Sequence, residues 1–173
     1  MKAGFNGMIN DVMSYDAVDL LKVKNALVWI QSSLEYQDIP YQVVGGLAAY
    51  IYGAKRAVED IDLYIPRETV QKLMPIISPY ISKPLTHYVE NNWDLEYVQL
   101  IYEGQKIEIG LTPGVKIRQS EGDWVIQHID YTTSIFSEFE GIRVPLMPKY
   151  QLIEYKLILA REVDHFDIDL IDY

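Results

Sequence analysis

The fold is decided by residues 43–62, which read VVGGLAAYIYGAKRAVEDID. The run at 41–44 predicts a short strand, and the run at 47–52 predicts a short helix. Gly45 and Gly46 separate the two, and glycine lets a backbone adopt positive φ and approach a ligand closely. Because the start of the helix exposes unpaired N–H groups and the positive end of its dipole, the segment predicts a phosphate-binding turn.

Two aspartates follow this helix on the next predicted strand, 60–65. Side chains alternate along a strand, so Asp60 and Asp62 share one face while Ile61 and Leu63 point to the core. Two carboxylates that project together repel each other unless a cation lies between them. Mg²⁺ is typically bound through one or two carboxylates plus substrate phosphates, so the pair predicts a magnesium site.

A third acid, Glu108, stands between two isoleucines in the predicted strand 106–111 and therefore faces away from the core. If the two strands are neighbours, three carboxylates meet on one face of a sheet. Such a trio could hold two metal ions about 3.5–4 Å apart, which would clamp the attacking and leaving oxygens of a phosphoryl displacement. Glu108 would then deprotonate the attacking group. The competing acids nearby are Glu96 and Glu103.

The segment from Val43 to Asp62 resembles the signature of nucleotidyltransferases of the DNA polymerase β superfamily. In that superfamily a Gly-Gly or Gly-Ser turn precedes a helix, and an Asp-x-Asp pair follows on the next strand. The C-terminal stretch is similar to the end of the small stand-alone members, which include relatives of abortive-infection toxin and antibiotic nucleotidyltransferases. The resemblance covers 41–66 and about 142–170, and the middle only through Glu108.

This resemblance implies an α/β (α+β) chain with the nucleotidyltransferase fold, a mixed β-sheet flanked by helices. It implies Mg²⁺-dependent transfer of a nucleoside monophosphate from a nucleoside triphosphate to a hydroxyl acceptor, with release of pyrophosphate. Val58 departs from the family pattern, since many relatives carry Ser or Thr there, and the third acid is more commonly Asp. The implied catalytic and metal-binding residues are Asp60, Asp62 and Glu108, and the implied nucleotide-binding residues are Gly45, Gly46, Arg56 and Lys156.

The basic residues each have a structural alternative. Arg56 could form a salt bridge to a surface acid, and Lys156 could be an ordinary solvated helix residue. Arg161 could reach the nucleotide or pair with Asp164 or Asp167 on the same helix face.

The composition is that of an ordinary globular protein, with 173 residues, 49% hydrophobic and 23% charged. It predicts one domain over 1–173, with C-terminal helices from about 148. A net charge of −10 disfavours generic nucleic-acid binding, although a local basic site is allowed. The absence of cysteine excludes thiolate zinc sites and cysteine nucleophiles. No membrane span or secretory signal is found, so a cytoplasmic location is expected.

Other chemistries find little support. The sequence has no P-loop and no Gly-x-Ser-x-Gly elbow, and its three histidines lack zinc-like spacing. Tyrosine is frequent, with 14 residues, and several could line an acceptor or base-stacking groove. The tyrosines considered for that groove are Tyr50, Tyr52, Tyr64, Tyr88, Tyr97 and Tyr102.

The rest of the chain gives weaker structural expectations. A helical period from Leu20 to Leu34 predicts a first helix capped by Asp16 or Ser14. Residues 67–74 predict another helix, followed by an irregular stretch with three prolines. The segments 95–102 and 106–111 predict a hairpin, and 124–129 and 142–144 predict weaker strands. A last helical region is expected after Pro148, with one face made of Leu152, Tyr155, Leu159 and Val163, and Leu170 is expected in a short final segment.

Three functions remain open at this point. The first is a nucleotidyltransferase acting on a small molecule or a protein side chain. The second is a non-catalytic binding module in a two-protein system, such as a toxin–antitoxin pair. The third is a transferase that modifies RNA ends, which the acidic charge weakens because a long acceptor needs a basic track. A homodimer could complete the groove, and a partner protein belongs to the second of these functions.

Overall fold

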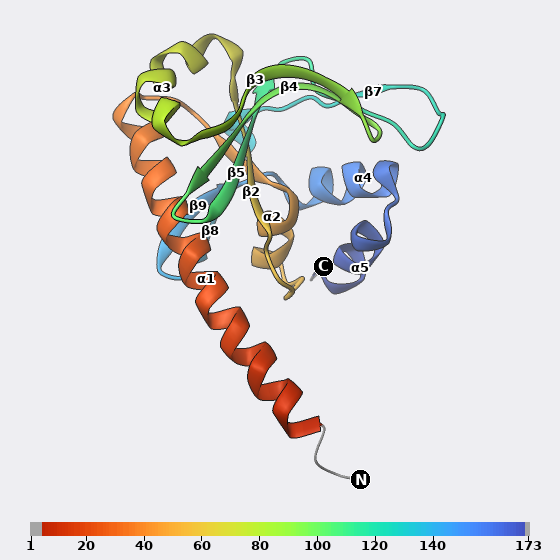
Figure 1. Ribbon diagram of the computed structural model, residues 1–173. Helices are drawn as coiled ribbons and strands as arrows, with labels where there is room; N and C mark the ends of the chain where they lie inside the picture. Colours follow the sequence, from red (N-terminus) through yellow and green to blue (C-terminus); the bar gives the residue numbers. More distant parts are fainter. Residues whose placement is uncertain (1–4, 172–173) are drawn as a thin grey trace.

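A nine-stranded mixed sheet forms the centre of the protein, with helices on both faces (Figure 1). The structure is a computed structural model and describes residues 5–171, with side chains from residue 19 on. The helices are α1 (Phe5–Tyr36), α2 (Gly45–Ile51), α3 (Val70–Ile77), α4 (Lys149–Leu159) and α5 (Glu162–Leu170). The strands are β1 (Gln42–Val44), β2 (Asp60–Pro66), β3 (Ile81–Glu90), β4 (Trp93–Tyr102), β5 (Gln105–Thr112), β6 (Lys116–Ile117), β7 (Val125–Ile126), β8 (Ile135–Phe139) and β9 (Ile142–Leu146).

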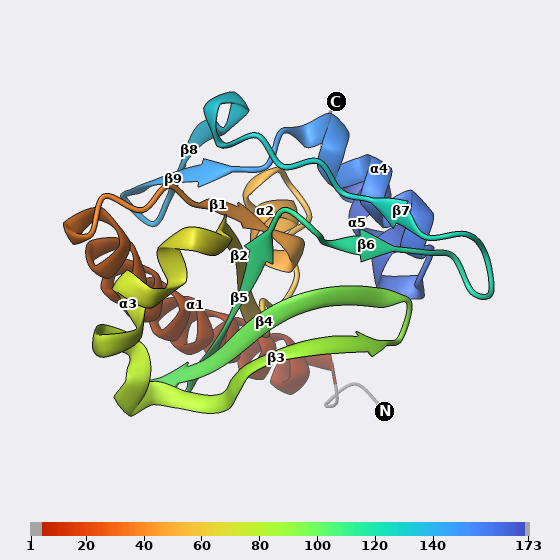
Figure 2. The same ribbon diagram turned by 90° about the horizontal axis from the view of Figure 1, so that it is seen from above.

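The middle of the sheet is built from β1, β2 and β5. β2 pairs in parallel with β5 and antiparallel with β1, and β1 pairs in parallel with β9. Viewed from above, the sheet runs from β8 and β9 at one edge through β1, β2 and β5 to β4 (Figure 2). β4 pairs with β3 and also with β6, which continues the sheet to β7. The mixed sheet predicted from the sequence is therefore confirmed.

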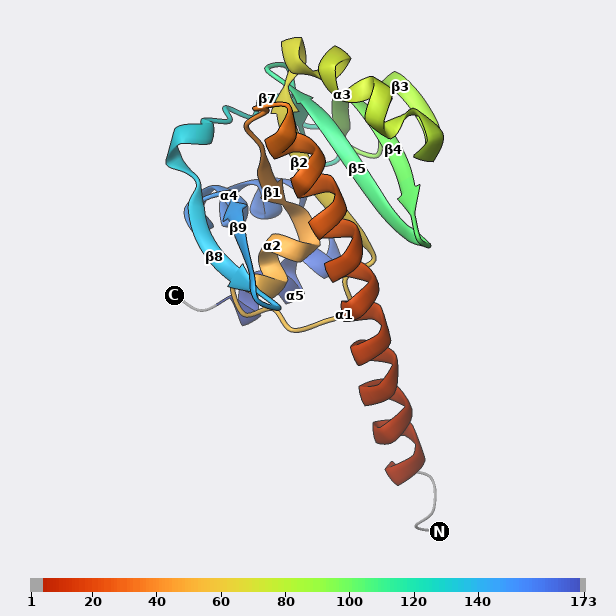
Figure 3. The same ribbon diagram turned by 90° about the vertical axis from the view of Figure 1, so that its left-hand side faces the viewer.

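The two faces of the sheet have different neighbours. α1 and α3 lie on one side, whereas α2, α4 and α5 lie on the other, with α1 extending past the sheet (Figures 1 and 3). The predicted helical period is confirmed, because Val23, Leu27, Ile30 and Leu34 are buried without exposure. They belong to the same core as the inward side chains of β2 and β5, which include Ile61, Leu63, Ile107 and Ile109.

α1 begins earlier than the sequence predicted. It starts at Phe5, so the expected caps at Asp16 and Ser14 lie inside the helix and that prediction is wrong. No glycine or proline interrupts residues 8–36, so nothing stops the helix from extending toward the N-terminus. Of residues 5–171, no helix is both long and apolar enough to cross a membrane.

The proline-containing stretch after residue 74 is more regular than predicted. α3 continues through Pro75 to Ile77, and β3 includes Pro84. Strand prolines are tolerated at edges and at bulges. β3 pairs only with β4 in the sheet described, and its register shifts on both sides of Lys83. β8 also forms where no strand was predicted, as an antiparallel partner of β9.

The C-terminal helices begin where expected, and there are two of them, α4 and α5. α4 starts after Pro148, and Ala160 ends it in the left-handed conformation at φ 51°. Leu152, Tyr155 and Leu159 are buried as predicted. Val163 does not continue that face, because it belongs to α5 and is 37% exposed.

Candidate active site

Three carboxylates meet on the face of the sheet that is turned toward α2, α4 and α5. The parallel register of β2 and β5 places Asp62 opposite Glu108 and Asp60 opposite Lys106. Oxygen atoms of Asp60, Asp62 and Glu108 all lie within 4.8 Å of one another. Among the described residues this is the one group of three acidic or metal-ligating side chains so arranged. The structure thus brings together the three acids predicted from the sequence.

The electrostatics of this trio favour a bound cation. Burial, together with the charges of Glu108 and Asp60, raises the pKa of Asp62 to about 8. On the outer side, Lys106 Nζ lies 3.2 Å from Asp60 Oδ1. Carboxylate oxygens that are partly buried and this close repel one another, and they are the ligands that Mg²⁺ prefers. The donor set therefore fits a divalent metal ion.

The glycine turn lies directly against the carboxylates. Gly45 has φ +66°, a conformation that L side chains rarely adopt, and a Cβ atom there would lie 2.3 Å from Asp62 Oδ2. A Cβ atom on Gly46 would lie 3.1 Å from Arg56 Nη2. The two glycines thus leave room for an acid on one side and a guanidinium on the other. The helix begins at Gly45 itself, two residues earlier than predicted.

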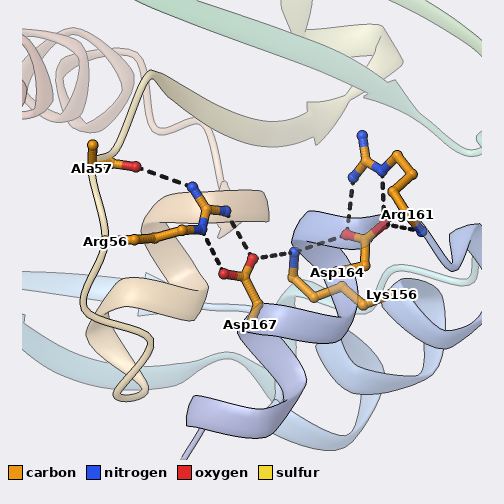
Figure 4. A network of polar contacts seen from close by, with 6 residues as sticks. All are labelled: Arg56, Ala57, Lys156, Arg161, Asp164 and Asp167. Atoms are coloured by element: carbon orange, nitrogen blue, oxygen red, sulfur yellow. Dashed lines mark hydrogen bonds and ion pairs between the residues drawn. The ribbon is translucent and has the colours of Figure 1, made fainter.

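Three basic residues form a chain of ion pairs with two acids of α5 (Figure 4). Arg56 donates to both oxygens of Asp167, at 2.6 and 2.8 Å. Lys156 Nζ lies between the two acids, 2.9 Å from Asp167 Oδ2 and 3.2 Å from Asp164 Oδ1. Arg161 donates to both oxygens of Asp164, at 2.7 and 3.0 Å.

These contacts decide between the alternatives for the basic residues. Lys156 is 1% exposed, so the solvated-helix alternative is wrong. Arg56 does pair with an acid, but its partner Asp167 is fully buried rather than at the surface. Arg161 forms the pair with Asp164 that its spacing predicted. Contact between these three basic residues and a nucleotide stays a prediction.

The ion pairs keep both α5 acids ionised. Burial alone would raise the pKa of Asp167, but hydrogen bonds from Arg56 and Lys156 hold that pKa below its usual value. Burial likewise opposes ionisation of Asp164, where hydrogen bonds from Arg161 and Lys156 lower the pKa. Removing one partner from such a buried network is costly, since it leaves an uncompensated charge.

A cavity of about 470 Å³ joins the acids, the glycine turn and the basic residues. Its other wall comes from the β3–β4 hairpin, through Tyr88, Trp93, Leu95 and Tyr97. Of the six tyrosines considered from the sequence, Tyr64, Tyr88 and Tyr97 line the cavity. The other three do not; Tyr102, for example, stacks on Trp29 with ring centroids 4.3 Å apart.

Gln99 is a polar side chain at the site that no sequence pattern predicted. Gln99 is the partner of Glu108 in the β4–β5 register, and its Nε2 donates to Glu108 Oε1 at 2.8 Å. Ser82 Oγ in turn donates to Gln99 Oε1 at 3.1 Å. No local motif marks Gln99, because its role depends on which residue lies opposite it across the hairpin. The acids Asp164 and Asp167 were noted only as partners of Arg161.

Comparison with solved structures identifies the fold. TM1012 from Thermotoga maritima, assigned provisionally as a nucleotidyltransferase, is 23% identical over 77% of this chain and 82% of its own, with TM-score 0.63. The lincosamide antibiotic adenylyltransferase LnuA is 17% identical over 83% of this chain and 92% of its own, with TM-score 0.56. The antibiotic-resistance factor ANT(2'')-Ia is 15% identical over 89% of this chain and 80% of its own, with TM-score 0.54.

The sequence matches no protein-family model and no curated protein. The structural similarities nevertheless confirm the fold expected from the glycine turn and the Asp-x-Asp strand. The chain has the nucleotidyltransferase fold, and residues 5–171 contain five α-helices and a mixed sheet. The aligned region covers at least 80% of each of these three chains, so the similarity extends over most of each structure.

Proposed function

We propose that this protein is a Mg²⁺-dependent nucleotidyltransferase that moves a nucleoside monophosphate from a nucleoside triphosphate to a hydroxyl group of a small-molecule acceptor. The observation that carries the proposal is the convergence of Asp60, Asp62 and Glu108 within 4.8 Å of one another beside the Gly45 turn. The shared fold supports the class of reaction. Because nucleoside triphosphates are the donor, we infer a cytoplasmic location.

The roles of the residues follow from their places around the cavity. Asp60, Asp62 and Glu108 would hold the metal, which when bound neutralises the charge that develops on the transferred phosphoryl group. Glu108 takes the proton from the acceptor hydroxyl. The acceptor oxygen forms a bond to the α-phosphorus as the bond from that phosphorus to the bridging oxygen breaks, and pyrophosphate leaves. The triphosphate would lie against Gly45 and Gly46.

The acceptor would occupy the hairpin side of the cavity. Trp93, Leu95 and Tyr97 alternate along β4 on the cavity side and lead to Gln99, which contacts Glu108. Lys83 is the one cation that the hairpin adds to this wall. An apolar wall next to the proposed base suits a small molecule with an apolar body better than a nucleic acid. LnuA, which modifies lincosamide antibiotics, offers a precedent in the same fold.

Labelling identifies the acceptor directly. The protein is incubated with each α-³²P nucleoside triphosphate, Mg²⁺ and a small-molecule cell extract, and the labelled product is isolated. Transfer should depend on the metal and disappear in Asp60→Ala and Asp62→Ala, while Asp169→Asn on the exposed side of α5 should transfer normally. An active Asp60→Ala/Asp62→Ala protein would exclude the mechanism. If calorimetry finds no metal-dependent nucleotide binding, the alternative of a non-catalytic binding module is favoured instead.

A further inference from the structure

The two buried acids of α5 lie behind the basic residues of the active site. Arg56, Lys156 and Arg161 line the cavity, whereas Asp164 and Asp167 are not among its lining residues and are both 0% exposed. Each basic side chain is therefore held by a carboxylate of α5 (Figure 4). Arg56 Nη1 also donates to the Ala57 carbonyl at 3.0 Å, which fixes that guanidinium further.

Hydrogen-bond capacity remains on the cavity side of the cluster. An ammonium group has three donor hydrogens, and the two acids take two from Lys156. Arg161 uses Nε and Nη2 for Asp164, and a guanidinium has five donor hydrogens, so Nη1 is available. Arg56 lies against the glycine turn, where Nη2 is 3.1 Å from the position of a Gly46 Cβ. The cluster can thus contact an anion at the turn without breaking its internal bonds.

The charge of the cluster calls for an explanation. Three cations and two carboxylates leave one net positive charge next to the site proposed for a triphosphate. If the cluster served only to attract an anion, the attraction would be stronger without the two carboxylates. Yet each pair is bidentate or bridging, and such geometry fixes the direction of a guanidinium or ammonium group. Preorganised donors bind a charged group without the cost of ordering them first.

We propose that Asp164 and Asp167 are positioning residues of the nucleotide site, which act through Arg56, Lys156 and Arg161 to aim three cations at the β- and γ-phosphates. This inference rests on the proposed function, since it requires a triphosphate in the cavity. It assigns α5 a role in substrate binding although its acids touch no substrate. Simple electrostatics predicts that removal of a negative charge from α5 tightens the binding of a polyanion. Positioning predicts the opposite, namely that this removal weakens the binding.

The test compares charge-neutral variants of α5 that keep the side-chain shape. Asp167→Asn and Asp164→Asn are measured beside Asp169→Asn, the matched control on the exposed side of the same helix. Calorimetry with inorganic tripolyphosphate and Mg²⁺ reports on the phosphate subsite without a base or sugar. Binding of Mn²⁺ alone, followed by electron paramagnetic resonance, reports on the three metal-binding acids, and thermal unfolding reports on the fold.

The two explanations predict changes of opposite sign in the affinity for tripolyphosphate, so the measurement distinguishes them. Positioning predicts that Asp167→Asn and Asp164→Asn weaken tripolyphosphate binding by roughly tenfold or more, with Mn²⁺ binding unchanged. It also predicts a smaller effect of Asp164→Asn when Arg161→Gln is already present. Equal or tighter tripolyphosphate binding in either folded variant would overturn the proposal, because the acids would then be only counter-ions or packing groups.

A measurement on the unmodified protein keeps the proposal testable if the variants do not fold. Tripolyphosphate with Mg²⁺ should slow hydrogen exchange at the backbone amides of 164–167, because a ligand on the cations stabilises the acids that hold them. Unchanged exchange in α5 under saturating tripolyphosphate would contradict the inference. If the wild-type protein binds neither tripolyphosphate nor any nucleoside triphosphate, the proposed function fails as well, and that outcome is distinct from a loss confined to the variants.

Discussion

Asp62 and Glu108 lie directly opposite each other in the parallel pair of β2 and β5, and their carboxylates share one side of the sheet with Asp60. Burial and the charges of its acidic neighbours raise the pKa of Asp62, so this carboxyl group binds a proton more readily than a free aspartate does. This arrangement suits a division of labour in which the buried acid binds metal and the other also accepts a proton.

Replacement of Glu108 should slow nucleotidyl transfer. In Glu108→Gln the side chain keeps its size but no longer takes a proton, so nucleotidyl transfer should fall by roughly 10²–10⁴-fold. Glu103→Gln is the control, because Glu103 lies in the exposed turn between β4 and β5, and this variant should transfer at the wild-type rate. Rates are measured as pyrophosphate release under saturating nucleotide. Near-normal release in Glu108→Gln would argue that another group is the base.

The raised pKa of Asp62 predicts how stability depends on pH. Its carboxyl holds a proton in the folded protein up to about pH 8, but in the unfolded chain it loses that proton near its usual pKa. This contribution is fully present below the unfolded pKa and is lost as the pH rises through about 8. The metal-free melting temperature should therefore fall from pH 5 to pH 8, and Asp62→Asn should flatten the decline.

Added Mg²⁺ should raise the melting temperature more at pH 8 than at pH 6, because a metal ion must displace the proton from Asp62 at the lower pH. Asp164 and Asp167 contribute a pH dependence of stability that is opposite to that of Asp62. Their lowered pKa values stabilise the folded protein above about pH 4, and this stabilisation is lost on acidification. Equal effects of Mg²⁺ at both pH values would contradict the assignment of Asp62 as a ligand.

Gly45→Ala should disturb the metal site as well as the backbone. The left-handed conformation costs a residue with a side chain about 1–2 kcal/mol, and the new Cβ would also collide with Asp62 Oδ2. Gly141→Ala provides the control, because Gly141 has φ +80° but nothing within 4 Å of its Cβ position. Both variants should lose stability in urea unfolding, whereas only Gly45→Ala should lose Mn²⁺ binding. Intact Mn²⁺ affinity in Gly45→Ala would show that Asp62 moves freely.

Gln99 should matter for the orientation of Glu108. Gln99→Met keeps the length and bulk of the side chain but removes the hydrogen bond of 2.8 Å to Glu108, so the turnover rate should fall by about 10–100-fold. Ser82→Ala removes only the support behind Gln99 and should have a smaller effect. If Gln99 orients Glu108, the pH profile of turnover should also shift in Gln99→Met. Unchanged kinetics in Gln99→Met would mean that Glu108 needs no orientation.

Much of the site could be predicted because its signals are local. The alternation at Asp60 and Asp62, the glycine pair and the isoleucines that flank Glu108 each fix an orientation within a few residues. Only one long-range assumption, that the two strands are neighbours, was needed to bring the acids together. β2 and β5 fulfil it as a parallel pair.

The remainder depends on contacts that local patterns do not encode. Gln99 reaches Glu108 only through the β4–β5 register. The pairing of Arg56 with Asp167 depends on how α5 packs against the loop after α2. The end of α4 at Ala160 has no glycine or proline to mark it, so the change of direction that places Asp164 beside Lys156 is set by tertiary contacts.

The register of the three adjacent strands has a consequence for engineering and evolution. Asp62, Glu108 and Gln99 are cross-strand neighbours, so a slip of β5 by one residue would exchange Glu108 for an isoleucine and send the carboxylate into the hydrocarbon interior. Misaligned chains would thus be both unstable and inert. A single-residue insertion inside β5 would therefore disrupt the acid cluster and the packing of the core together.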